Sequence, residues 1–513
     1  MKLGSLHARA LYFITVLLLL LIIPNFCHGV ICKESSVVET VWRQQQNVET
    51  ADYNWSYRGF SVAELLEERE GFGRNATGGL NGRVYRVTTL ADSGPGSLRE
   101  AASTSEPLWI VFDVSGTIEL KSTINVRSNK TIDGRGAEIT ITGYGLKISK
   151  ASNIIIVNIR FDTAANVDID ALSIDSNSRD IWVHHCDFTN YSDGALDITN
   201  QSTDITISWC RFWNHDKVML IGNDPGKTGD AIIRVTLHHN FFFRTVQRTP
   251  RLRFGKVDAY NNYYFGWQSY AIGVAMGGQV LAEANIFEAE NQKVVAQYRV
   301  GSDPEEGYIK MVNNLLLNGA NAKSYKAENV FNRSEYYEAR VEPADDALRS
   351  KIMAQAGASI PVKPKIMTDS KLQREDWRFK APLTDPVQAG TALTLYAVIP
   401  PYRSQSERVS IYEWNFGDGN ITLTTSTSII HIYQFGGIYN ITVSLKSPEG
   451  STISIINATL NVIGPSSGGS GGGGGSVGGG ETSIRDPDPF YYVLIGIVIL
   501  VIAIVAWIFI KRV

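Results

Sequence analysis

The sequence predicts an all-β protein, in which a right-handed parallel β-helix is followed by an immunoglobulin-like β-sandwich and one C-terminal transmembrane helix. Three observations carry this prediction. A short motif recurs every 22 to 29 residues in the middle of the chain, the composition becomes rich in Thr, Ser and Ile near residue 389, and an uncharged apolar run lies close to the C-terminus. A chain of 513 residues has room for two or three domains.

The repeat predicts the solenoid. Segments of about four to six residues, many of them β-branched or aromatic, alternate with Asn, Asp or Gly turns, and no helical pattern separates them. A step of 20 to 30 residues fits one coil of three strands. The polar members of the repeat lie at Asn158, Asp187, Arg211, Asn240, Asn262, Asn285 and Asn314.

The repeat also places Cys186 and Cys210 at the same position of successive coils. Stacked strands lie about 4.8 Å apart, which is within the Cα distance range of a disulfide. Two alternatives remain open, namely a Cys186–Cys210 disulfide or two stacked free thiols.

The two ends of the chain predict its location. Two basic residues precede an apolar run within residues 1–29, which is typical of a signal peptide, with an N-terminal membrane anchor as the alternative. Residues 490–510 contain no charge in 21 residues, and as a helix they would span about 31 Å, the thickness of a bilayer core. The preceding linker, residues 464–489, begins with nearly pure Gly and Ser and offers no core that could bury this run. Basic residues in the tail over residues 511–513 predict a cytoplasmic C-terminus, with the body of the chain on the extracellular face of the membrane.

Nine Asn-X-Ser/Thr sequons fit this location, because a secreted chain meets the glycosylation machinery. Each sequon alone is a weak signal, and we expect several of them to carry glycans. The candidates are Asn54, Asn75, Asn129, Asn190, Asn200, Asn332, Asn420, Asn440 and Asn457.

Charge balance and cysteine content exclude other classes of protein. The formal net charge is -3, from 48 Lys and Arg against 51 Asp and Glu, so a nucleic-acid partner is not expected. Four cysteines are too few for a disulfide-based fold. A hydrophobic content of 44% is that of a chain with a packed core.

Four aspartates recur at about one solenoid period. Asp168 and Asp170 lie on one coil, and Asp193 and Asp197 lie on the next, so their carboxylates are expected on one face. Stacked like charges repel each other and need a cation, and hard oxygen ligands suit Ca²⁺ rather than Zn²⁺. We therefore predict a Ca²⁺ site here, with solvated turn carboxylates as the alternative.

Three basic residues, Lys217, Arg248 and Arg253, follow on later coils. Above a bound cation they would form a groove for an anionic chain, and arginine makes bidentate contacts with carboxylates. A salt bridge to a neighbouring coil is the alternative for each of them.

Two adjacent histidine pairs, His184–His185 and His238–His239, invite a metal interpretation. Neighbours in a strand point to opposite faces, so a pair is not expected to chelate one ion. We interpret these histidines as core or ladder residues.

Nine fragments stand in an order and spacing that carry a family resemblance. They are Gly71–Gly79, Val84–Thr88, Gly94–Arg99, Thr131–Gly136, Trp182–His185, Asp193–Asp197, Thr206–Trp209, His215–Leu220 and Arg248–Arg253. From Gly71 to about Trp377 the chain resembles a pectate lyase of the parallel β-helix type (polysaccharide lyase family 1), which implies a lyase domain over residues 38–380. The chain departs from the family pattern at His184, where that pattern has Asp.

The resemblance implies a Ca²⁺ cofactor at the four aspartates, Arg248 as catalytic base, and Lys217 and Arg253 as substrate-binding residues. It implies β-elimination on de-esterified pectin (polygalacturonate), an acidic polysaccharide. A guanidinium is almost always protonated, so the base role requires neighbouring cations that disfavour its charged form. The alternatives are a lyase for methyl-esterified pectin or for another uronate polysaccharide, and a non-catalytic, glycan-binding β-helix adhesin.

Three segments near the C-terminus, Tyr412–Gly419, His431–Tyr433 and Gly437–Thr442, carry a second resemblance. Residues 389–463 resemble a PKD domain, in which Trp414 and Phe416 are expected to face the sandwich core. We interpret this domain as a spacer, with weak glycan or protein contact as the alternative, and we predict that the protein is a monomer.

Overall fold

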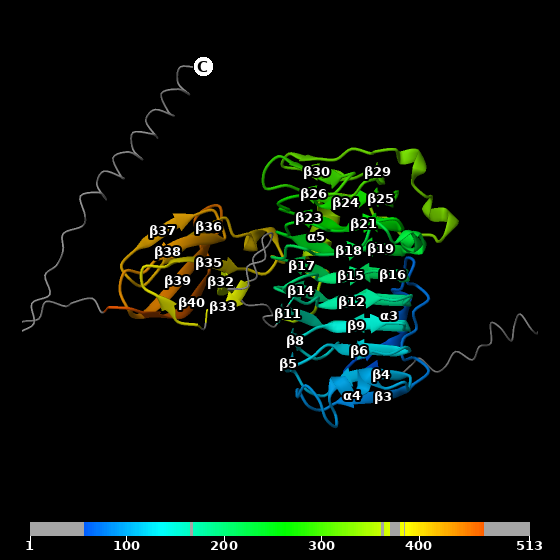
Figure 1. Ribbon diagram of the computed structural model, residues 1–513, viewed down its shortest axis with the longest axis horizontal. Helices are drawn as coiled ribbons and strands as arrows, with labels where there is room; N and C mark the ends of the chain where they lie inside the picture. The colour runs from blue at the N-terminus through cyan, green and yellow to red at the C-terminus, as the bar shows by residue number, and fades with distance from the viewer. Residues whose placement is uncertain (1–55, 165–167, 361–363, 370–379, 384, 466–513) are drawn as a thin grey trace, which may run out of the picture. The chain divides into compact units, whose positions relative to one another are not determined.

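The structure is a computed structural model that describes residues 56–164, 168–360, 364–369, 380–383 and 385–465 (Figure 1). The predicted signal peptide, most of the predicted linker, the predicted transmembrane segment and the sequon at Asn54 lie outside these residues. Among the residues described, no helix is long and apolar enough to cross a membrane.

Three parallel sheets form a solenoid whose coils stack from β3 at one end to β29 at the other (Figure 1). In each central coil the chain runs through the three sheets in turn, as in β13, β14 and β15. Apolar residues alternate along many of the strands because one side of each strand faces the interior of the coil. The parallel β-helix predicted from the repeat is therefore confirmed.

The first sheet contains, in spatial order, β3 (Arg83–Val87), β4 (Leu108–Phe112), β7 (Lys130–Asp133), β10 (Ser152–Val157), β13 (Arg179–His184), β16 (Thr203–Ser208), β19 (Arg234–His238), β22 (Lys256–Tyr260), β25 (Gln279–Glu283) and β29 (Tyr308–Val312). The second sheet contains β5 (Gly116–Leu120), β8 (Ile139–Gly143), β11 (Arg160–Ala164), β14 (Asp187–Thr189), β17 (Arg211–Trp213), β20 (Phe241–Phe243), β23 (Tyr263–Phe265), β26 (Ile286–Glu288) and β30 (Leu315–Leu317). The third sheet contains β6 (Ile124–Val126), β9 (Leu146–Ser149), β12 (Leu172–Asp175), β15 (Leu196–Ile198), β18 (Leu220–Ile221), β21 (Arg251–Arg253), β24 (Ile272–Ala275) and β28 (Ala296–Gln297). Two small sheets pair β1 (Ser56–Tyr57) with β2 (Phe60–Ser61) and β27 (Lys293–Val294) with β31 (Ala320–Asn321).

Stacked aromatic rings fill part of the solenoid interior. Because parallel strands pair in register, equivalent side chains of successive coils lie on top of one another. Six rings of the second sheet form one such column, with neighbouring centroids 4.6 to 5.1 Å apart. The column consists of Phe161, Phe188, Phe212, Phe242, Tyr264 and Phe287.

A buried asparagine ladder runs between the first and second sheets. The side-chain oxygen of Asn262 accepts the backbone N–H of Asn240 at 3.0 Å, and Asn285 and Asn314 continue the same pattern. Asn240 in turn accepts the backbone N–H of Cys210 at 2.9 Å. The last four polar members of the predicted repeat thus occupy the same position on successive coils.

The earlier coils differ in register from the prediction. Asp187 pairs with Arg211, and Arg211 pairs with Phe241 rather than with Asn240. The ladder position on these coils belongs to Cys210 and Cys186, since the backbone N–H of Cys186 donates to Sγ of Cys210 at 3.4 Å. The two cysteines therefore do share one position, and both are buried free thiols. The disulfide alternative is not what the structure contains.

Three short helices accompany the solenoid: α3 (Val62–Glu67), α4 (Leu98–Ser103) and α5 (Asp346–Gln355). Each begins after a residue whose side chain accepts a backbone N–H of the first turn, as Ser61 does from Glu64. Isolated 3₁₀ turns lie at Thr228–Ile232, Ala327–Asn329, Arg333–Glu335 and Gln405–Glu407.

The region after the solenoid forms two antiparallel-rich sheets. One contains β33 (Lys380–Pro382), β32 (Lys365–Asp369), β35 (Ala392–Val398) and β38 (Ser428–Ile432). The other contains β34 (Val387–Gln388), β40 (Thr452–Ile463), β39 (Gly437–Lys446), β36 (Ile411–Asn415) and β37 (Ile421–Thr424). Trp414 and Phe416 are buried in the core, as predicted.

The sequons differ in exposure. Asn190 is buried, and its side-chain amide donates to Asp162 at 2.9 Å. A glycan cannot be attached to an amide that is enclosed in this way, so Asn190 is corrected as a glycosylation candidate. Asn129 and Asn200 are half-buried. The exposed candidates are Asn75, Asn332, Asn420, Asn440 and Asn457.

Candidate active site

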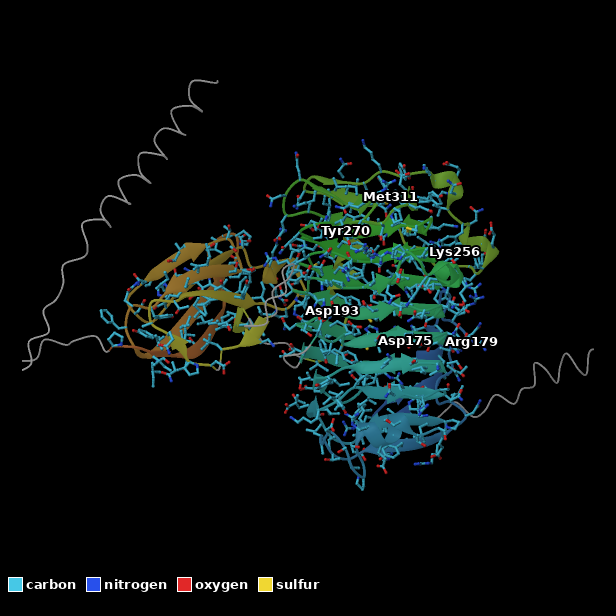
Figure 2. The ribbon with its side chains drawn as sticks, in the orientation of Figure 1. Asp175, Arg179, Asp193, Lys256, Tyr270 and Met311 are labelled. Carbon is cyan, nitrogen blue, oxygen red and sulfur yellow. The ribbon has the colours of Figure 1, made fainter. Side chains whose placement is uncertain are left out.

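The acidic corner, which we define as Asp168, Asp170, Asp193 and Asp197, lies where the chain passes from the second sheet to the third. Asp168 and Asp170 precede β12, and Asp193 precedes β15, which contains Asp197. Figure 2 labels Asp193, which lies on the coil of β14 and β15. The predicted grouping of the four aspartates on two successive coils is therefore what the structure has.

Gly194 brings two of these carboxylates together. Its backbone N–H donates to Oδ1 of Asp170 at 2.8 Å. A Cβ at this position would lie 2.6 Å from Oδ1 of Asp197 and 2.7 Å from Oδ1 of Asp170. The two oxygens thus face the same point, and only glycine leaves room for them.

The pKa values of the same two carboxyls are raised. Burial, followed by the negative charge of Asp193, raises the pKa of Asp170 to about 6, although the Gly194 N–H opposes this effect. Burial, and next the charge of Asp170, raises the pKa of Asp197 well above its ordinary value, against the N–H that Leu220 donates at 2.9 Å. These carboxylates are crowded in a poorly solvated region, where a divalent cation would compensate their charge.

The donor set fits Ca²⁺. This ion takes oxygen ligands from flexible carboxylates, and the acidic corner offers carboxylate oxygens from four residues. Lys217 is the competitor for one of them, because its Nζ lies 3.1 Å from Oδ1 of Asp193. Asp193 is also fixed through its carbonyl oxygen, which accepts a hydrogen bond from Nε2 of His215 at 2.8 Å.

Arg248 lies on the next coil but one and approaches the acidic corner. Its positive charge acts on both Asp170 and Asp197. Its backbone has a φ of 63°, in the left-handed region, and its carbonyl accepts the N–H of Met219 at 2.7 Å. The half-buried guanidinium makes no hydrogen bond or ion pair with any residue that the structure describes, and its Nε is enclosed without a partner. Arg248 is thus held by its backbone, and the residues described leave its side-chain donors unused.

Arg253 differs from Arg248. Its Nε donates to Oδ1 of Asp303 at 2.8 Å, another N–H donates to the carbonyl of Gly222 at 3.0 Å, and the residue is 7% exposed. Arg251 contacts the other oxygen of Asp303 at 2.9 Å. The structure therefore commits two donor groups of Arg253 to internal contacts, and its substrate-binding role stays a prediction.

Two residues of this region escaped the sequence analysis. Asp303 lies in a turn some 50 residues after the arginines that it binds, so sequence spacing gave no signal. The Tyr270 hydroxyl is buried without a partner among the residues described, and burial raises its pKa while Arg251, Arg248 and Arg253 lower it. Figure 2 labels Tyr270 on a later coil than Asp193.

The histidine pairs do not behave as regular strand neighbours. His184 ends β13, and His185 has a φ of 47°, so the chain turns between them. Their rings lie 4.3 Å apart between centroids and face the same region. His239, with a φ of 55°, similarly brings its Nδ1 to 2.9 Å from Nδ1 of His238. The expectation that such neighbours point to opposite faces is wrong at these positions.

Comparisons with known proteins agree with this architecture. The family model described as pectate lyase matches residues 114–359, and the model described as PKD domain matches residues 379–460. The chain is 37% identical over 309 residues to putative pectate lyase 21 of Arabidopsis thaliana, a match that covers 55% of this chain and 76% of that protein. It is 37% identical over 291 residues to a pectate lyase of Nicotiana tabacum, covering 52% of this chain and 70% of that protein. Among solved structures, that of jun a 1, the major allergen from cedar pollen, matches with a TM-score of 0.51 and 32% identity over 56% of this chain and 92% of that chain.

Proposed function

The chain belongs to the pectate lyase family, and from this premise we propose that Arg248 and the acidic corner carry out its reaction. The protein is a pectate lyase, and it cleaves de-esterified pectin, an acidic polysaccharide. The observation that supports this site is the guanidinium of Arg248, which has no hydrogen-bond or ion-pair partner among the residues described and acts on the carboxylates of Asp170 and Asp197.

The reaction is a β-elimination. A base takes the C5 proton of a galacturonate unit, the electron pair of the C–H bond forms the C4–C5 double bond, and the C4–O bond breaks. The departing oxygen stays on the other fragment, takes up a proton and becomes the hydroxyl at the new end of that fragment. Products are one chain with an unsaturated end and one with an ordinary end, so no water is consumed.

Arg248 is the residue that we place at the C5 proton. Its guanidinium makes no hydrogen bond or ion pair with the residues described, whereas Arg251 and Arg253 each bind Asp303, so Arg248 can approach substrate without breaking a contact to those residues. The base role needs a neutral guanidine, which neighbouring positive charges favour.

Asp168, Asp170, Asp193 and Asp197 would hold Ca²⁺. When bound, the ion would draw negative charge from the substrate carboxylate and so stabilise the carbanion that forms at C5. Lys217, already at 3.1 Å from Asp193, would bind a substrate carboxylate at the edge of the site, and Arg253 would support it with its remaining donor. A methyl ester lacks the charge that these groups recognise, which favours de-esterified substrate.

The test is an assay of the full-length chain on polygalacturonate, followed by the ultraviolet absorbance of the unsaturated product. We expect product to appear, to stop in excess chelator, and to return with added Ca²⁺. Methyl-esterified pectin serves as the matched substrate and should give much less product. Activity that persists in excess chelator contradicts the Ca²⁺ site, and a preference for the ester supports the pectin lyase alternative.

We also propose that the enzyme acts as a monomer on the extracellular face of the cell membrane, with residues 464–489 as tether and the PKD-like domain as spacer. The support is the sequence of the two termini, whose residues lie outside those described. Proteolysis within residues 464–480 should release soluble enzyme of unchanged turnover. A chain that is soluble before cleavage contradicts the anchor.

A further inference from the structure

A second group of ligand-bearing side chains lies at the other end of β14, where the chain passes from the first sheet to the second. It consists of Glu68, His184 and His185, which we call the histidine corner. Each residue offers one ligand atom, and these atoms lie within 4.8 Å of one another, which holds for no other group of three in the part of the chain that the structure describes. The histidine corner shares no residue with the acidic corner.

We propose that Glu68, His184 and His185 bind a late first-row divalent cation, with Zn²⁺ as the ion that fits best. Two imidazoles and one carboxylate are a common ligand set for Zn²⁺ with one position left for water. Ca²⁺ and Mg²⁺ prefer oxygen ligands alone. Ligand atoms around a tetrahedral Zn²⁺ lie about 3.4 Å apart, and Oε2 of Glu68 already lies 3.1 Å from Nε2 of His184.

The backbone explains how two consecutive histidines reach one ion. His184 is the last residue of β13, and the left-handed φ of 47° at His185 reverses the side-chain direction that a strand would impose. The rings are inclined at 75° with centroids 4.3 Å apart. Two imidazoles at a steep angle can direct one nitrogen each toward a common point.

Each imidazole ring is oriented by a contact at its Nδ1 atom. Nδ1 of His184 lies 2.9 Å from Oγ of Ser208, which also accepts the indole N–H of Trp182 at 2.8 Å. Nδ1 of His185 lies 3.3 Å from the carbonyl oxygen of Gly357. Protein ligands of this type usually donate one ring N–H to such an acceptor and present the other nitrogen to the metal, so both Nε2 atoms are the metal-facing ones.

Glu68 supplies the charge from a different part of the chain. It follows α3, and its backbone N–H donates to the carbonyl of Leu65, which fixes the end of the helix. Its side chain is 53% exposed, whereas that of His184 is 1% exposed. An ion can therefore enter from the side of Glu68, and on binding it would connect the α3 segment to the coil of β13.

Two of the positive charges around the same cavity, those of Arg135 and Arg211, are already paired with carboxylates. Arg135, which lines the cavity, binds both oxygens of Asp133 at 2.9 and 2.7 Å. Arg211, which also lines it, binds both oxygens of Asp187 at 2.8 Å. A cation at the histidine corner thus meets two imidazole nitrogens and one carboxylate that lie within 4.8 Å of one another.

The experiment measures Zn²⁺ binding to the full-length chain, stripped of metal and kept in excess Ca²⁺ so that the acidic corner is occupied. We expect one Zn²⁺ per chain by calorimetry, and Co²⁺ in its place should show the visible absorption of a tetrahedral N/O site. Glu68→Gln, at an exposed position, should weaken Zn²⁺ binding by at least about 100-fold without loss of thermal stability in the absence of metal. Glu64→Gln, which changes another acid of the same cavity, is the matched control and should bind as the wild type does.

His185→Gln provides a second variant and should abolish the Co²⁺ spectrum. Stoichiometric binding that survives in both Glu68→Gln and His185→Gln overturns the proposal, as does the absence of any binding in the wild type. Binding lost only in His239→Gln would also overturn it, because the ion would then lie at His238 and His239. Pectate cleavage is not the readout, so this result is independent of the proposed reaction.

Discussion

The acidic corner and the histidine corner are two candidate cation sites at opposite ends of one short strand, and they differ in how the free protein keeps its ligands together. At the histidine corner, neutral imidazoles approach each other and Glu68 within 4.8 Å. At the acidic corner, no three ligand atoms are gathered so closely among the residues described, and the pKa values of Asp170 and Asp197 are raised by crowding. Neutral ligands can be held ready by hydrogen bonds, whereas like charges store repulsion that a bound cation relieves.

Among the substitutions that test this comparison, we expect Arg248→Lys to have the largest effect on turnover. Arg248→Lys keeps the charge but shortens the reach and loses the planar group. If Arg248 takes the C5 proton, we expect turnover to fall by about 10³-fold or more, with little change in the affinity for oligogalacturonate or Ca²⁺. Turnover, affinity and melting temperature of the one variant should be measured together.

Arg251→Lys is the matched control for this experiment. Arg251 binds Asp303 and the carbonyl of Val300, so its loss should lower the melting temperature and leave turnover within about tenfold. If Arg248→Lys behaves in the same way as Arg251→Lys, Arg248 is a structural residue and Lys217 becomes the next candidate for the base.

The metal requirement gives the next largest effect. Asp193→Asn removes one charge from the acidic corner and weakens the 3.1 Å contact with Lys217, because a neutral amide oxygen replaces the carboxylate. We expect the Ca²⁺ concentration for half-maximal activity to rise by about 10- to 100-fold. Asp175→Asn is the control. Asp175 lies on the neighbouring coil, where Figure 2 labels it, and its carboxylate lies 2.8 Å from Nζ of Lys147 instead. An equal Ca²⁺ requirement in both variants would remove Asp193 from the site.

The acidic corner and the histidine corner should also change the free energy of unfolding with pH in opposite directions. The pKa of Asp170 is about 6 in the folded protein, above the value of about 3.9 in an unfolded chain. Proton binding to Asp170 therefore stabilises the folded protein. This stabilisation is fully present below about pH 4 and is lost as the pH rises through 6. The lowered pKa values of His184 and His185 act the other way, since protonation below about pH 6.5 favours the unfolded chain.

Asp170→Asn isolates the acidic contribution. Without Ca²⁺, the variant should exceed the wild type in free energy of unfolding by about 2–3 kcal/mol at pH 7, and the difference should vanish near pH 4. Excess Ca²⁺ should reverse the order, because only the wild type gains from the ion. Denaturant unfolding at both pH values measures this, and a difference independent of pH would mean that Asp170 is well solvated.

The sequence was sufficient to predict the parallel β-helix because its motif recurs with each coil from Asn158 onward. The four equivalent asparagines from Asn240 onward hydrogen-bond in register as the repeat suggests. The register failed at Asp187 and Arg211, since Cys186 and Cys210 occupy the ladder position there and a thiol does not resemble an amide in sequence. Residue type therefore led to the wrong alignment of these coils, because backbone pairing alone decides which residues share a ladder position.

The sites were predictable to different degrees for a related reason. The four aspartates recur with the coil, so the acidic corner followed from spacing. The histidine corner depends on one left-handed residue, His185, and on Glu68 from a distant helix end, and neither leaves a periodic signal. The ion pair of Arg253 with Asp303 is likewise hidden, because the turn that carries Asp303 follows no repeat.

The smallest predicted effect tests whether the histidine corner is held ready by hydrogen bonds. Ser208→Ala removes the hydroxyl that orients His184 through Nδ1, while Glu68, His184 and His185 remain. We expect Zn²⁺ affinity to fall by about tenfold, the usual consequence of losing an outer partner of a metal-binding histidine. Ser202→Ala is the matched control, since Ser202 is a buried hydroxyl of the same coil that accepts the Ser178 N–H. Both variants should lose some stability, but only Ser208→Ala should weaken Zn²⁺. If the two variants bind Zn²⁺ equally well, His184 is oriented by packing against Trp182, whose ring lies 4.4 Å away, and the contrast between the two corners rests on charge alone.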